Sequence, residues 1–276
     1  MASLDVLVPT CARPAALAVT LATLVSQSYQ DFRVVVSDQG ERQPAADAGE
    51  VKAVVRLLEH HGHEPLVVSH LPRRGVAENR QFLLDQATAP LLLFLDDDLL
   101  LEPWVIERMT GAIEEEGCGF VGSAVIGLSY GGDVRPNEQA IEFWEGRVTP
   151  ETVLPGTPGW ERHRLHNAAN LLHVAERMGL DPRRPRKYRV AWVGGCVLYD
   201  ARALRGVGGF EFWRDLPVDH AGEDVLAQLR VMARYGGCGL IPSGVYHQEL
   251  PTTLTDRRYD APQRLPIVAG TSESED

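Results

Sequence analysis

The sequence predicts an α/β fold with a mostly parallel sheet that helices cover on both faces. Short apolar runs alternate with segments of helical spacing through the first half of the chain. These runs are apolar at nearly every position, as is typical of parallel strands that are buried on both sides. With 276 residues, of which 44% are hydrophobic and 24% charged, the chain is long enough to bury a sizeable core in one large domain.

The first half of the chain contains four expected strands with a helix between each successive pair. The strands are runs rich in Val, Leu or Phe, and polar or proline-containing turns separate them from the helices. In chain order, we expect a strand at 6–10, a helix that opens at Pro14 and continues through Val25, a strand at 32–36, a helix at 49–61, a strand at 66–69, a helix at 76–87 and a strand at 90–95.

The pattern is looser after Asp98. Pro, Arg, Gly and Trp accumulate between residues 129 and 189, which we interpret as loops around a single helix. In chain order, we expect a helix at 102–116, a strand at 120–126, a helix at 168–178, a strand at 190–199, a helix at 223–235, a strand at 239–247 and a disordered tail at 270–276.

The acidic balance of the chain limits its partners. Lys and Arg number 27 against 38 Asp and Glu, a formal net charge of −11, so the overall field repels nucleic acids and anionic membrane surfaces. The longest apolar run, 90–95, is far shorter than the roughly 20 residues of a membrane span, and the N-terminus has no leader pattern. The four cysteines form neither a disulfide pattern nor a zinc pattern. We therefore expect a cytoplasmic protein with no integral membrane span and no nucleic-acid partner.

The most informative stretch is the acidic triplet Asp96-Asp97-Asp98, which follows the most apolar expected strand. Open parallel sheets bind ligands at the carboxyl ends of their strands. Alternation along an extended chain would point Asp96 and Asp98 the same way, so that both could bind one Mg²⁺ or Mn²⁺. The alternative is an acidic cluster at the start of the next helix, which Pro103 opens.

Two further segments carry groups that suit a nucleotide. Asp38 follows the second strand, where its carboxylate could accept hydrogen bonds from a base or a ribose, although Ser37-Asp38-Gln39-Gly40 also fits an ordinary turn. Arg73, Arg74 and Arg80 lie around a helix start on an otherwise acidic chain, and guanidinium groups there suit phosphate oxygens. A solvated helix face is the alternative for each arginine.

Candidate catalytic groups lie near the C-terminus. Glu223 and Asp224 fall in the first turn of an expected helix, where acids stabilise the helix dipole by about 0.3–1 kcal/mol. The functional alternative is a general base at the mouth of the ligand crevice. His247 ends the last expected strand, as a metal ligand or as an ordinary structural histidine.

Several common motifs are missing from the sequence. The glycines do not form a dinucleotide fingerprint, and there is neither a P-loop nor a nucleophile elbow. Hydride transfer, P-loop hydrolysis and esterase chemistry with a catalytic triad therefore lose support.

Taken in order, these residues resemble the family 2 glycosyltransferases, which have the GT-A fold. The likeness covers most of the chain, and it rests on the order of short motifs that are weak individually. The motifs are Val6-Leu7-Val8-Pro9-Thr10 with Arg13, Thr23 to Tyr29 before Phe32, Val34 to Asp38, Gly75 through Asn79-Arg80, Phe94 to Asp98, Trp192 to Cys196, Gly208-Gly209-Phe210 and Gly222-Glu223-Asp224.

The resemblance implies a GT-A-type mixed, mostly parallel sheet, with a Rossmann-like nucleotide-binding half and an acceptor half. It implies that residues 1–128 bind a nucleoside-diphosphate sugar, that 129–189 form a variable insertion on the acceptor side, and that 190–269 form the acceptor and catalytic half. The activity that it implies is metal-dependent transfer of the sugar to an acceptor hydroxyl, with inversion in a single displacement.

The resemblance also assigns roles to residues of this chain. Asp224 matches the catalytic base, with Glu223 beside it. The ligands of Mn²⁺ or Mg²⁺ would be Asp96, Asp98 and His247. The residues that would bind the donor are Pro9, Thr10, Arg13, Asp38, Arg74, Asn79, Arg80, Asp96 and Asp97.

Two departures from the family pattern leave the substrates open. Ser37-Asp38-Gln39-Gly40 replaces the commoner Asp-Asp-Gly-Ser turn, and residues 130–188 match nothing in the pattern. The acceptor could be a glycan, a lipid-linked molecule or a small molecule, and a second copy of the chain is a candidate partner in a homodimer. The Ala- and Arg-rich composition is typical of a GC-rich bacterial source.

Two other functions and one surface remain open at this stage. A nucleotidyltransferase would also place carboxylates around Mg²⁺, and a catalytically silent nucleotide-sugar-binding module would share the scaffold. Aromatic rings could form a stacking surface for a sugar, although core packing explains at least half of them. The tryptophans concerned are Trp144, Trp160, Trp192 and Trp213.

Overall fold

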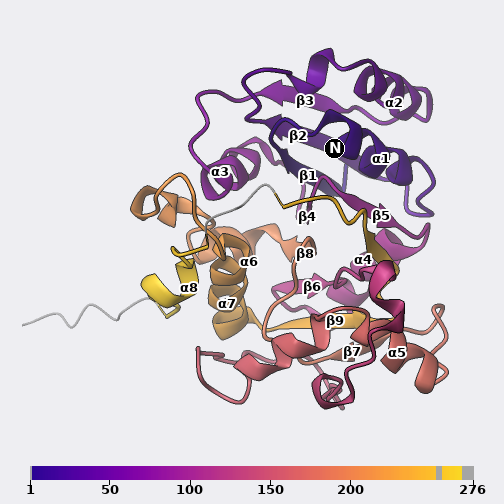
Figure 1. The fold of residues 1–276 in the computed structure, drawn as a ribbon, viewed down its shortest axis with the longest axis vertical. Coiled ribbons are helices and arrows are strands. Elements are labelled where there is room, and N and C mark those ends of the chain that lie inside the picture. The colour runs from indigo at the N-terminus through magenta and orange to yellow at the C-terminus, as the bar shows by residue number, and fades with distance from the viewer. Residues whose placement is uncertain (1, 253–256, 269–276) are drawn as a thin grey trace, which may run out of the picture.

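Four apolar strands form the parallel half of an eight-stranded sheet in the computed structural model, which describes residues 2–252 and 257–268 (Figure 1). They lie in the order β3-β2-β1-β4. Parallel pairing places the carboxyl ends of these strands along one edge of the sheet, which is where the acidic triplet begins. The strands are β1 (Leu4–Thr10), β2 (Phe32–Asp38), β3 (Leu66–Ser69) and β4 (Leu91–Leu95).

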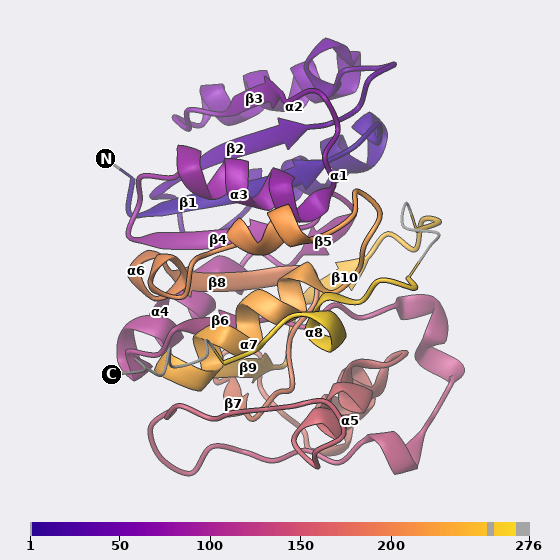
Figure 2. The same cartoon turned by 90° about the vertical axis from the view of Figure 1, so that its left-hand side faces the viewer.

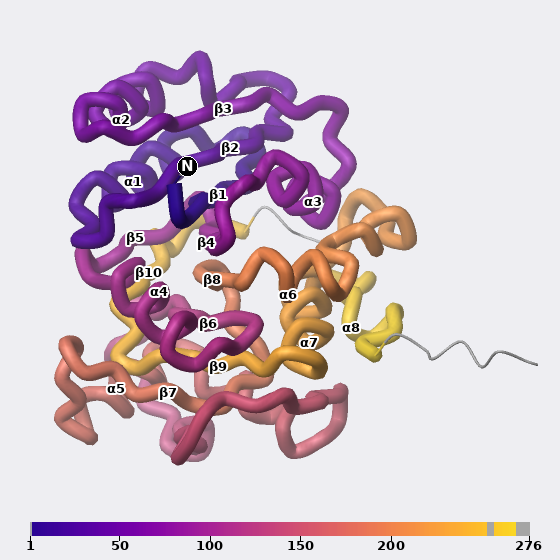
Figure 3. Tube along the Cα trace, turned by 180° about the vertical axis from the view of Figure 1, so that it is seen from behind, coloured from indigo at the N-terminus to yellow at the C-terminus, as the bar shows by residue number. Residues whose placement is uncertain are grey.

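Helices cover both faces of this half because successive strand side chains point to opposite sides. Val34 and Val36 pack in one core with α1 (Pro14–Val25) and α2 (Gly49–His60), whereas Val35 packs in the other core with α3 (Val76–Gln86). Figures 1 and 3 show the sheet edge-on with α1 and α2 on one side and α3 on the other. The predicted helices and strands of the first half are therefore confirmed, with bounds that differ by a few residues.

The second half extends the sheet with strands of both directions. β8 (Cys196–Asp200) pairs antiparallel with β4 and continues through β6 (Phe120–Gly122) and β9 (Gly237–Ile241) to β7 (Arg186–Tyr188). Four of the seven pairings are parallel, so the sheet is mixed with a parallel majority, as predicted.

The remaining long helices complete the two layers. α4 (Val105–Glu116) contributes to the same core as α1 and α2, while α6 (Ala201–Gly206) and α7 (Glu223–Tyr235) join α3 on the other face (Figure 2). The expected helix at 223–235 has the bounds of α7. Its first turn therefore carries Glu223 and Asp224, as predicted.

Three expected strands are shorter in the structure, and two of them are interrupted at glycines with a left-handed φ. The expected strand at 190–199 starts at Cys196, after Gly195 with a left-handed φ of 79°. The expected strand at 239–247 is divided at Gly244, where an added Cβ would lie 2.4 Å from the Trp104 ring. Its second part is β10 (Val245–His247), which pairs with β5 (Leu99–Leu101), a strand that the sequence reading missed. The expected strand at 120–126 ends at Gly122.

Short helices connect these elements, and the segment 129–189 joins the main sheet through β7. The predicted segment boundaries at 128 and 189 stay a prediction, and the expected disordered tail at 270–276 lies outside the described residues. None of the helices within 2–252 and 257–268 has the length and apolarity needed to span a membrane. The short helices are η1 (Ala45–Asp47), η2 (Leu128–Gly132), η3 (Pro136–Glu138), η4 (Trp160–His166), α5 (Asn170–Arg177), η5 (Glu211–Asp215) and α8 (Ala261–Arg264).

Candidate active site

A cleft of about 1330 Å³ opens at the carboxyl ends of β1 and β4, between the two halves of the chain. Its walls include the loop after β1, the start of α3, the loop before α7 and the end of β10. Most of the sequence-predicted site residues line this cleft. They are Pro9, Thr10, Arg13, Asn79, Arg80, Asp96, Asp97, Asp98, Glu223, Asp224 and His247.

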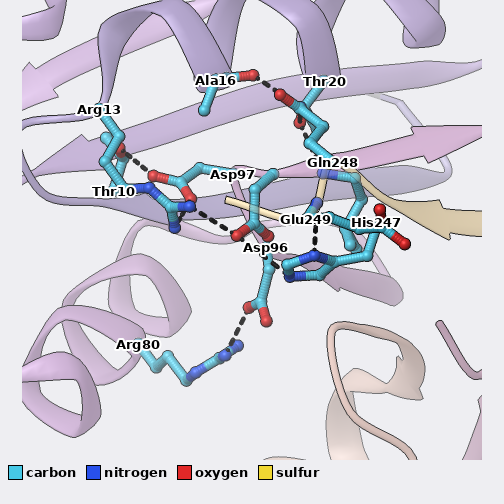
Figure 4. A network of polar contacts seen from close by, with 12 residues as sticks. Thr10, Arg13, Ala16, Thr20, Arg80, Asp96, Asp97, His247, Gln248 and Glu249 are labelled. Carbon is cyan, nitrogen blue, oxygen red and sulfur yellow. Dashed lines mark hydrogen bonds and ion pairs between the residues drawn. The ribbon is translucent and has the colours of Figure 1, made fainter. Parts of the chain in front are cut away.

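Arg13 is fixed over the acidic triplet by two ion pairs (Figure 4). Its Nη1 lies 3.0 Å from Asp97 Oδ1, and its Nη2 lies 2.7 Å from Asp98 Oδ2. Thr10 Oγ1 donates a hydrogen bond to the other oxygen of Asp97, at 2.5 Å. Burial raises the pKa of Asp97 to about 6, against the opposing effects of Thr10 and Arg13. Asp97 therefore holds Arg13 in position from inside the protein.

Asp98 and His247 face each other from two elements that are distant in sequence. The His247 Nε2 lies 3.3 Å from Asp98 Oδ2. The backbone N–H of Glu249 donates to His247 Nδ1 at 2.7 Å, so the ring proton lies on Nε2, toward Asp98. Burial favours a higher pKa for Asp98, but the hydrogen bonds and charges of His247 and Arg13 outweigh it and lower that pKa. After loss of the Nε2 proton, the pair would present one oxygen and one nitrogen donor to a cation.

Asp96 makes its ion pair with Arg80 and is not bonded to Asp98 or His247 among the described residues. The expected alternation of Asp96 and Asp98 along one face is wrong, because β4 ends at Leu95 and residues 97–98 form a turn. Within the described ranges, no three Asp, Glu, His or Cys side chains are grouped as a ready-made cation site. The alternative reading of the triplet as a helix start is also wrong, since β5 separates it from α4.

Arg80 joins the two halves of the cleft from the middle of α3. Its Nη2 lies 2.8 Å from Asp96 Oδ1, and its Nε lies 3.0 Å from Glu223 Oε1. Arg80 and Glu223 are buried, whereas the Asp96 side chain is 39% exposed. Burial opposes the charge on Arg80, but the surrounding carboxylates outweigh it and raise the pKa of the guanidinium. The buried Arg80 and Glu223 charges are thus compensated by each other and by Asp96.

Asp224 is the half-buried carboxylate in the first turn of α7. Burial and the neighbouring Glu223 charge raise its pKa to about 7, against the opposing charge of Arg80. Gly222 begins the helix with a left-handed φ of 76°, and an added Cβ there would lie 2.3 Å from Asp260 Oδ1. A carboxylate with a pKa near neutrality at the wall of a cleft has the properties of a general base.

Two predicted donor-binding residues lie outside the cleft wall. Asp38 is buried, and its two oxygens accept the backbone N–H groups of Gly40 and Ala45 at 2.8 and 2.7 Å. Its carboxylate therefore stabilises the loop after β2. Arg74 is exposed and does not line the cleft. Each has a neighbour that does line it, Gln39 and Arg73.

Asn79 has an unsatisfied group in the cleft wall. Its Nδ2 donates to the Ser37 carbonyl at 3.1 Å, while its buried Oδ1 has no hydrogen-bond partner among the described residues. A buried acceptor without a partner costs about 1–3 kcal/mol. The atom is covered in this structure, so a ligand N–H or O–H group would reach it only after a local movement of the cleft wall.

The sequence reading missed two polar residues of the site, Gln39 and Gln228, and it named Arg73 in the basic cluster without including it in the donor-binding set. Arg73 pairs with Asp219 at 2.7 Å across the cleft mouth, and Gln39 lines the cleft beside Cys11. Gln228 is fully buried below Asp224 and bonds the backbone of Val193 in both directions. The basic cluster at 73–80 is the sequence signal for Arg73. Gln39 and Gln228 had no such signal, because their roles depend on partners far along the chain.

Sequence comparison connects the chain with a known enzyme family. The family model described as Glycosyl transferase family 2 matches residues 5–171. Two curated relatives, each described as validoxylamine A glucosyltransferase, come from Streptomyces hygroscopicus subsp. jinggangensis (strain 5008) and subsp. limoneus. Each is 35% identical over 153 residues, which is 55% of this chain. The alignments cover 34% and 32% of the relatives, so the chain matches about a third of their length.

Solved structures with a similar fold include S. aureus TarS and a mannosyltransferase. S. aureus TarS 1–349 in complex with UDP-GlcNAc superposes with a TM-score of 0.53 at 15% identity, over 91% of this chain and 60% of TarS. The mannosyltransferase PcManGT from Pyrobaculum calidifontis, in complex with GDP-Man and Mn²⁺, superposes with a TM-score of 0.55 at 17% identity. That match covers 92% of this chain and 59% of PcManGT. The predicted GT-A-type fold is therefore confirmed.

Proposed function

Because this chain belongs to glycosyl transferase family 2, we propose that it transfers a sugar from a nucleoside-diphosphate sugar to an acceptor hydroxyl. The reaction is a single displacement with inversion at the anomeric carbon, and it depends on a divalent cation. One observation carries the proposal. A carboxylate with a raised pKa, Asp224, lines the same cleft as two arginines and the Asp98–His247 pair.

The donor binds along the N-terminal wall of the cleft. Thr10, Arg13 and Asn79 come from the carboxyl end of β1 and from α3, where parallel sheets bind nucleotides. Arg13 and Arg80 stabilise the negative charge that develops on the leaving diphosphate, because their guanidinium groups are held rigidly by ion pairs. Asn79 Oδ1 accepts a hydrogen bond from a hydroxyl or N–H group of the nucleotide.

Asp98 and His247 are the residues that would hold a divalent cation beside the donor diphosphate. Mg²⁺ is commonly held by one or two carboxylates together with phosphate oxygens and water, and Mn²⁺ accepts both oxygen and imidazole ligands. The two side chains lie 3.3 Å apart, and they would supply one donor of each kind once the cation displaces the proton on His247 Nε2. When bound, such a cation supplies Lewis-acid stabilisation of the leaving group.

Asp224 acts as the general base. It removes the proton from the acceptor hydroxyl as the hydroxyl oxygen attacks the anomeric carbon and the bond to the diphosphate breaks. Glu223 is held by Arg80 and raises the pKa of Asp224 through its charge. The two acids therefore have different roles, with Asp224 at the reacting atoms and Glu223 as a positioning residue.

The relatives suggest which substrates to test first. The curated relatives are named for glucosyl transfer to validoxylamine A, and the two solved neighbours hold UDP-GlcNAc and GDP-Man. UDP-glucose, GDP-glucose, UDP-GlcNAc and GDP-mannose therefore form the first donor panel. Identification of the transferred product by mass spectrometry, with the anomeric configuration from NMR, tests the activity and the inversion.

The metal site gives a sharp test by calorimetry. We expect Mn²⁺ to strengthen binding of the cognate donor to the wild type at least tenfold, and Asp98→Asn to abolish this strengthening while it retains the weak metal-free binding. The reason is that the substitution removes the one charged oxygen ligand of the pair. Asp47→Asn, an exposed carboxylate on η1, is the matched control. Equal Mn²⁺ dependence in Asp98→Asn and the wild type would contradict the assignment.

The pH profile tests the base. Since Asp224 must be ionised to accept a proton and its pKa is raised to about 7, we expect kcat/KM to rise with pH through about 7 and to level off above it. Glu223→Gln removes a neighbouring negative charge, so the acidic limb should move to lower pH. If the acidic limb of the kcat/KM profile does not move in Glu223→Gln, a group other than Asp224 determines that limb.

A further inference from the structure

A smaller hollow adjoins the cleft on the side of the C-terminal half. This side pocket has a volume of about 530 Å³ and lies between the loop at 125–135, residues 166–168 and residues 247–250. His247 and Leu250 line both the cleft and the side pocket, so the two are neighbours with a common wall. Its volume lies within the range of about 300–1,000 Å³ that is typical of small-molecule sites.

An aromatic ring, Trp192, lines the same cleft as the proposed base. Trp192 is half-buried, and the ring of His163 stacks on it with centroids 5.0 Å apart and an angle of 8°. Trp160 packs against it at 4.7 Å. Both supporting rings belong to η4, in the segment 129–189 that the family pattern left unmatched. The two contacts hold Trp192 rigidly, as a stacking surface requires.

Gln228 connects this ring to Asp224. Its Nε2 donates to the Val193 carbonyl at 2.7 Å and to the Asp224 carbonyl at 3.2 Å, and its Oε1 accepts from the Val193 N–H at 2.8 Å. The residue after Trp192 is thereby tied to the first turn of α7. A fully buried side chain thus fixes the backbone that follows Trp192 against the first turn of α7.

His166 connects the ring to the side pocket. It is the last residue of η4, it lines the side pocket, and it is hydrogen-bonded to the backbone of Trp192. Its Nε2 also lies 2.9 Å from the Tyr188 hydroxyl. One short helix therefore supports the aromatic ring at one end and forms a wall of the side pocket at the other.

The side pocket is polar without a dominant charge. Arg135 is paired with Asp133 and Glu138, and the Glu249 carboxylate accepts the Ser129 N–H at 2.8 Å. Tyr130, which is 51% exposed, adds an aromatic face. An aromatic face beside hydrogen-bonding groups with balanced charges suits a neutral, hydroxyl-rich ring better than a phosphate or an acyl chain.

We propose that the acceptor is a polyhydroxylated molecule of at least two rings, with its reacting ring against Trp192 beside Asp224 and its second ring in the side pocket. The inference rests on the proposed function and adds the acceptor class to it. Two observations support this inference. The cleft and the side pocket share a wall at His247 and Leu250, and η4 contacts Trp192 in the cleft and also lines the side pocket.

The test compares one-ring and two-ring acceptors with a saturating concentration of the donor that the panel identifies. Methyl glucoside is the one-ring probe, and cellobiose, maltose and trehalose are the two-ring probes. For the wild type, we expect at least one two-ring probe to have a KM about tenfold below that of methyl glucoside, equivalent to about 1.4 kcal/mol of extra binding. Hydrolysis of the donor is measured in parallel, as the nucleoside diphosphate released when no acceptor is present.

Variants separate the two ring positions. Tyr130→Ala should raise the KM of the preferred two-ring probe about tenfold and leave that of methyl glucoside unchanged. Trp192→Ala should raise both, and Trp192→Phe should restore most of the loss. Leu128→Ala is the matched control, because Leu128 is 53% exposed close to Tyr130 but does not line the side pocket.

The outcomes distinguish this inference from the proposed function. Donor hydrolysis with no preference for any two-ring probe, or equal effects of Tyr130→Ala on both probe classes, would overturn the two-ring acceptor and leave glycosyl transfer standing. No turnover of any donor, with or without acceptor, would overturn both.

Discussion

The Asp224→Asn variant is expected to bind the donor as the wild type does and to lose about 10²–10⁴-fold in kcat. Asparagine keeps the shape of the side chain but cannot accept the acceptor proton. Donor affinity should persist because the arginines and the Asp98–His247 pair, which we propose to bind the diphosphate, are unchanged. Calorimetry with the donor and a steady-state assay measure the two quantities separately.

A surface carboxylate provides the control for this substitution. Asp215→Asn removes an exposed charge from η5, outside the cleft, and should leave both kcat and donor affinity unchanged. A kcat within threefold of the wild type for Asp224→Asn would exclude it as the base. Glu223→Asn would then be the next variant to measure.

The Arg80→Met variant is expected to lower the free energy of unfolding by about 3–5 kcal/mol at pH 8. Methionine fills a similar volume but leaves Glu223 as a buried charge without its partner, and Asp96 loses its ion pair. Burial already raises the pKa of Glu223, and the loss of Arg80 raises it further. Urea unfolding followed by circular dichroism measures the loss.

The pH dependence of this variant identifies the cause. Because Glu223 then binds a proton more readily in the folded state than in the unfolded state, the stability of Arg80→Met should increase as the pH falls from 8 to 5. The Arg80→Met/Glu223→Gln double variant should recover much of the loss at pH 8. Arg202→Met, an exposed arginine, is the control and should not change stability measurably. If Arg80→Met loses the same free energy of unfolding at pH 5 and at pH 8, the cause is lost packing and not the unpaired charge of Glu223.

Local patterns were sufficient for the architecture of the first half. Continuous apolar runs such as 90–95 predict strands that are buried on both faces, and helical spacing predicts the bounds of α7. Both predictions succeed because the order of apolar and polar residues along the chain reflects which faces of an element are buried. The breaks at Gly195 and Gly244 were missed because they depend on backbone angles and on the approach of Trp104 from another element.

Local patterns also identified most of the residues of the cleft, but they did not determine how the side chains are used. The placement of the triplet at a strand end predicted its position at the edge where the parallel strands end. The family resemblance, not this pattern, placed Asp224 and His247 in the same site, and all of them line the cleft. The directions of those side chains depended on the turn after Leu95, which sends Asp97 and Asp98 toward Arg13 and leaves Asp96 to Arg80.

The sequence by itself determined the family of the chain, the parallel half of its sheet and the edge at which the polar residues gather. Only the tertiary structure decided that Asp38 stabilises its own loop, that Arg80 bridges to Glu223 from 143 positions away, and that η4 supports Trp192. The physical reason is that secondary structure follows from the burial pattern of adjacent residues, whereas the partner of a charged or aromatic side chain is whichever group the folded chain brings within contact distance.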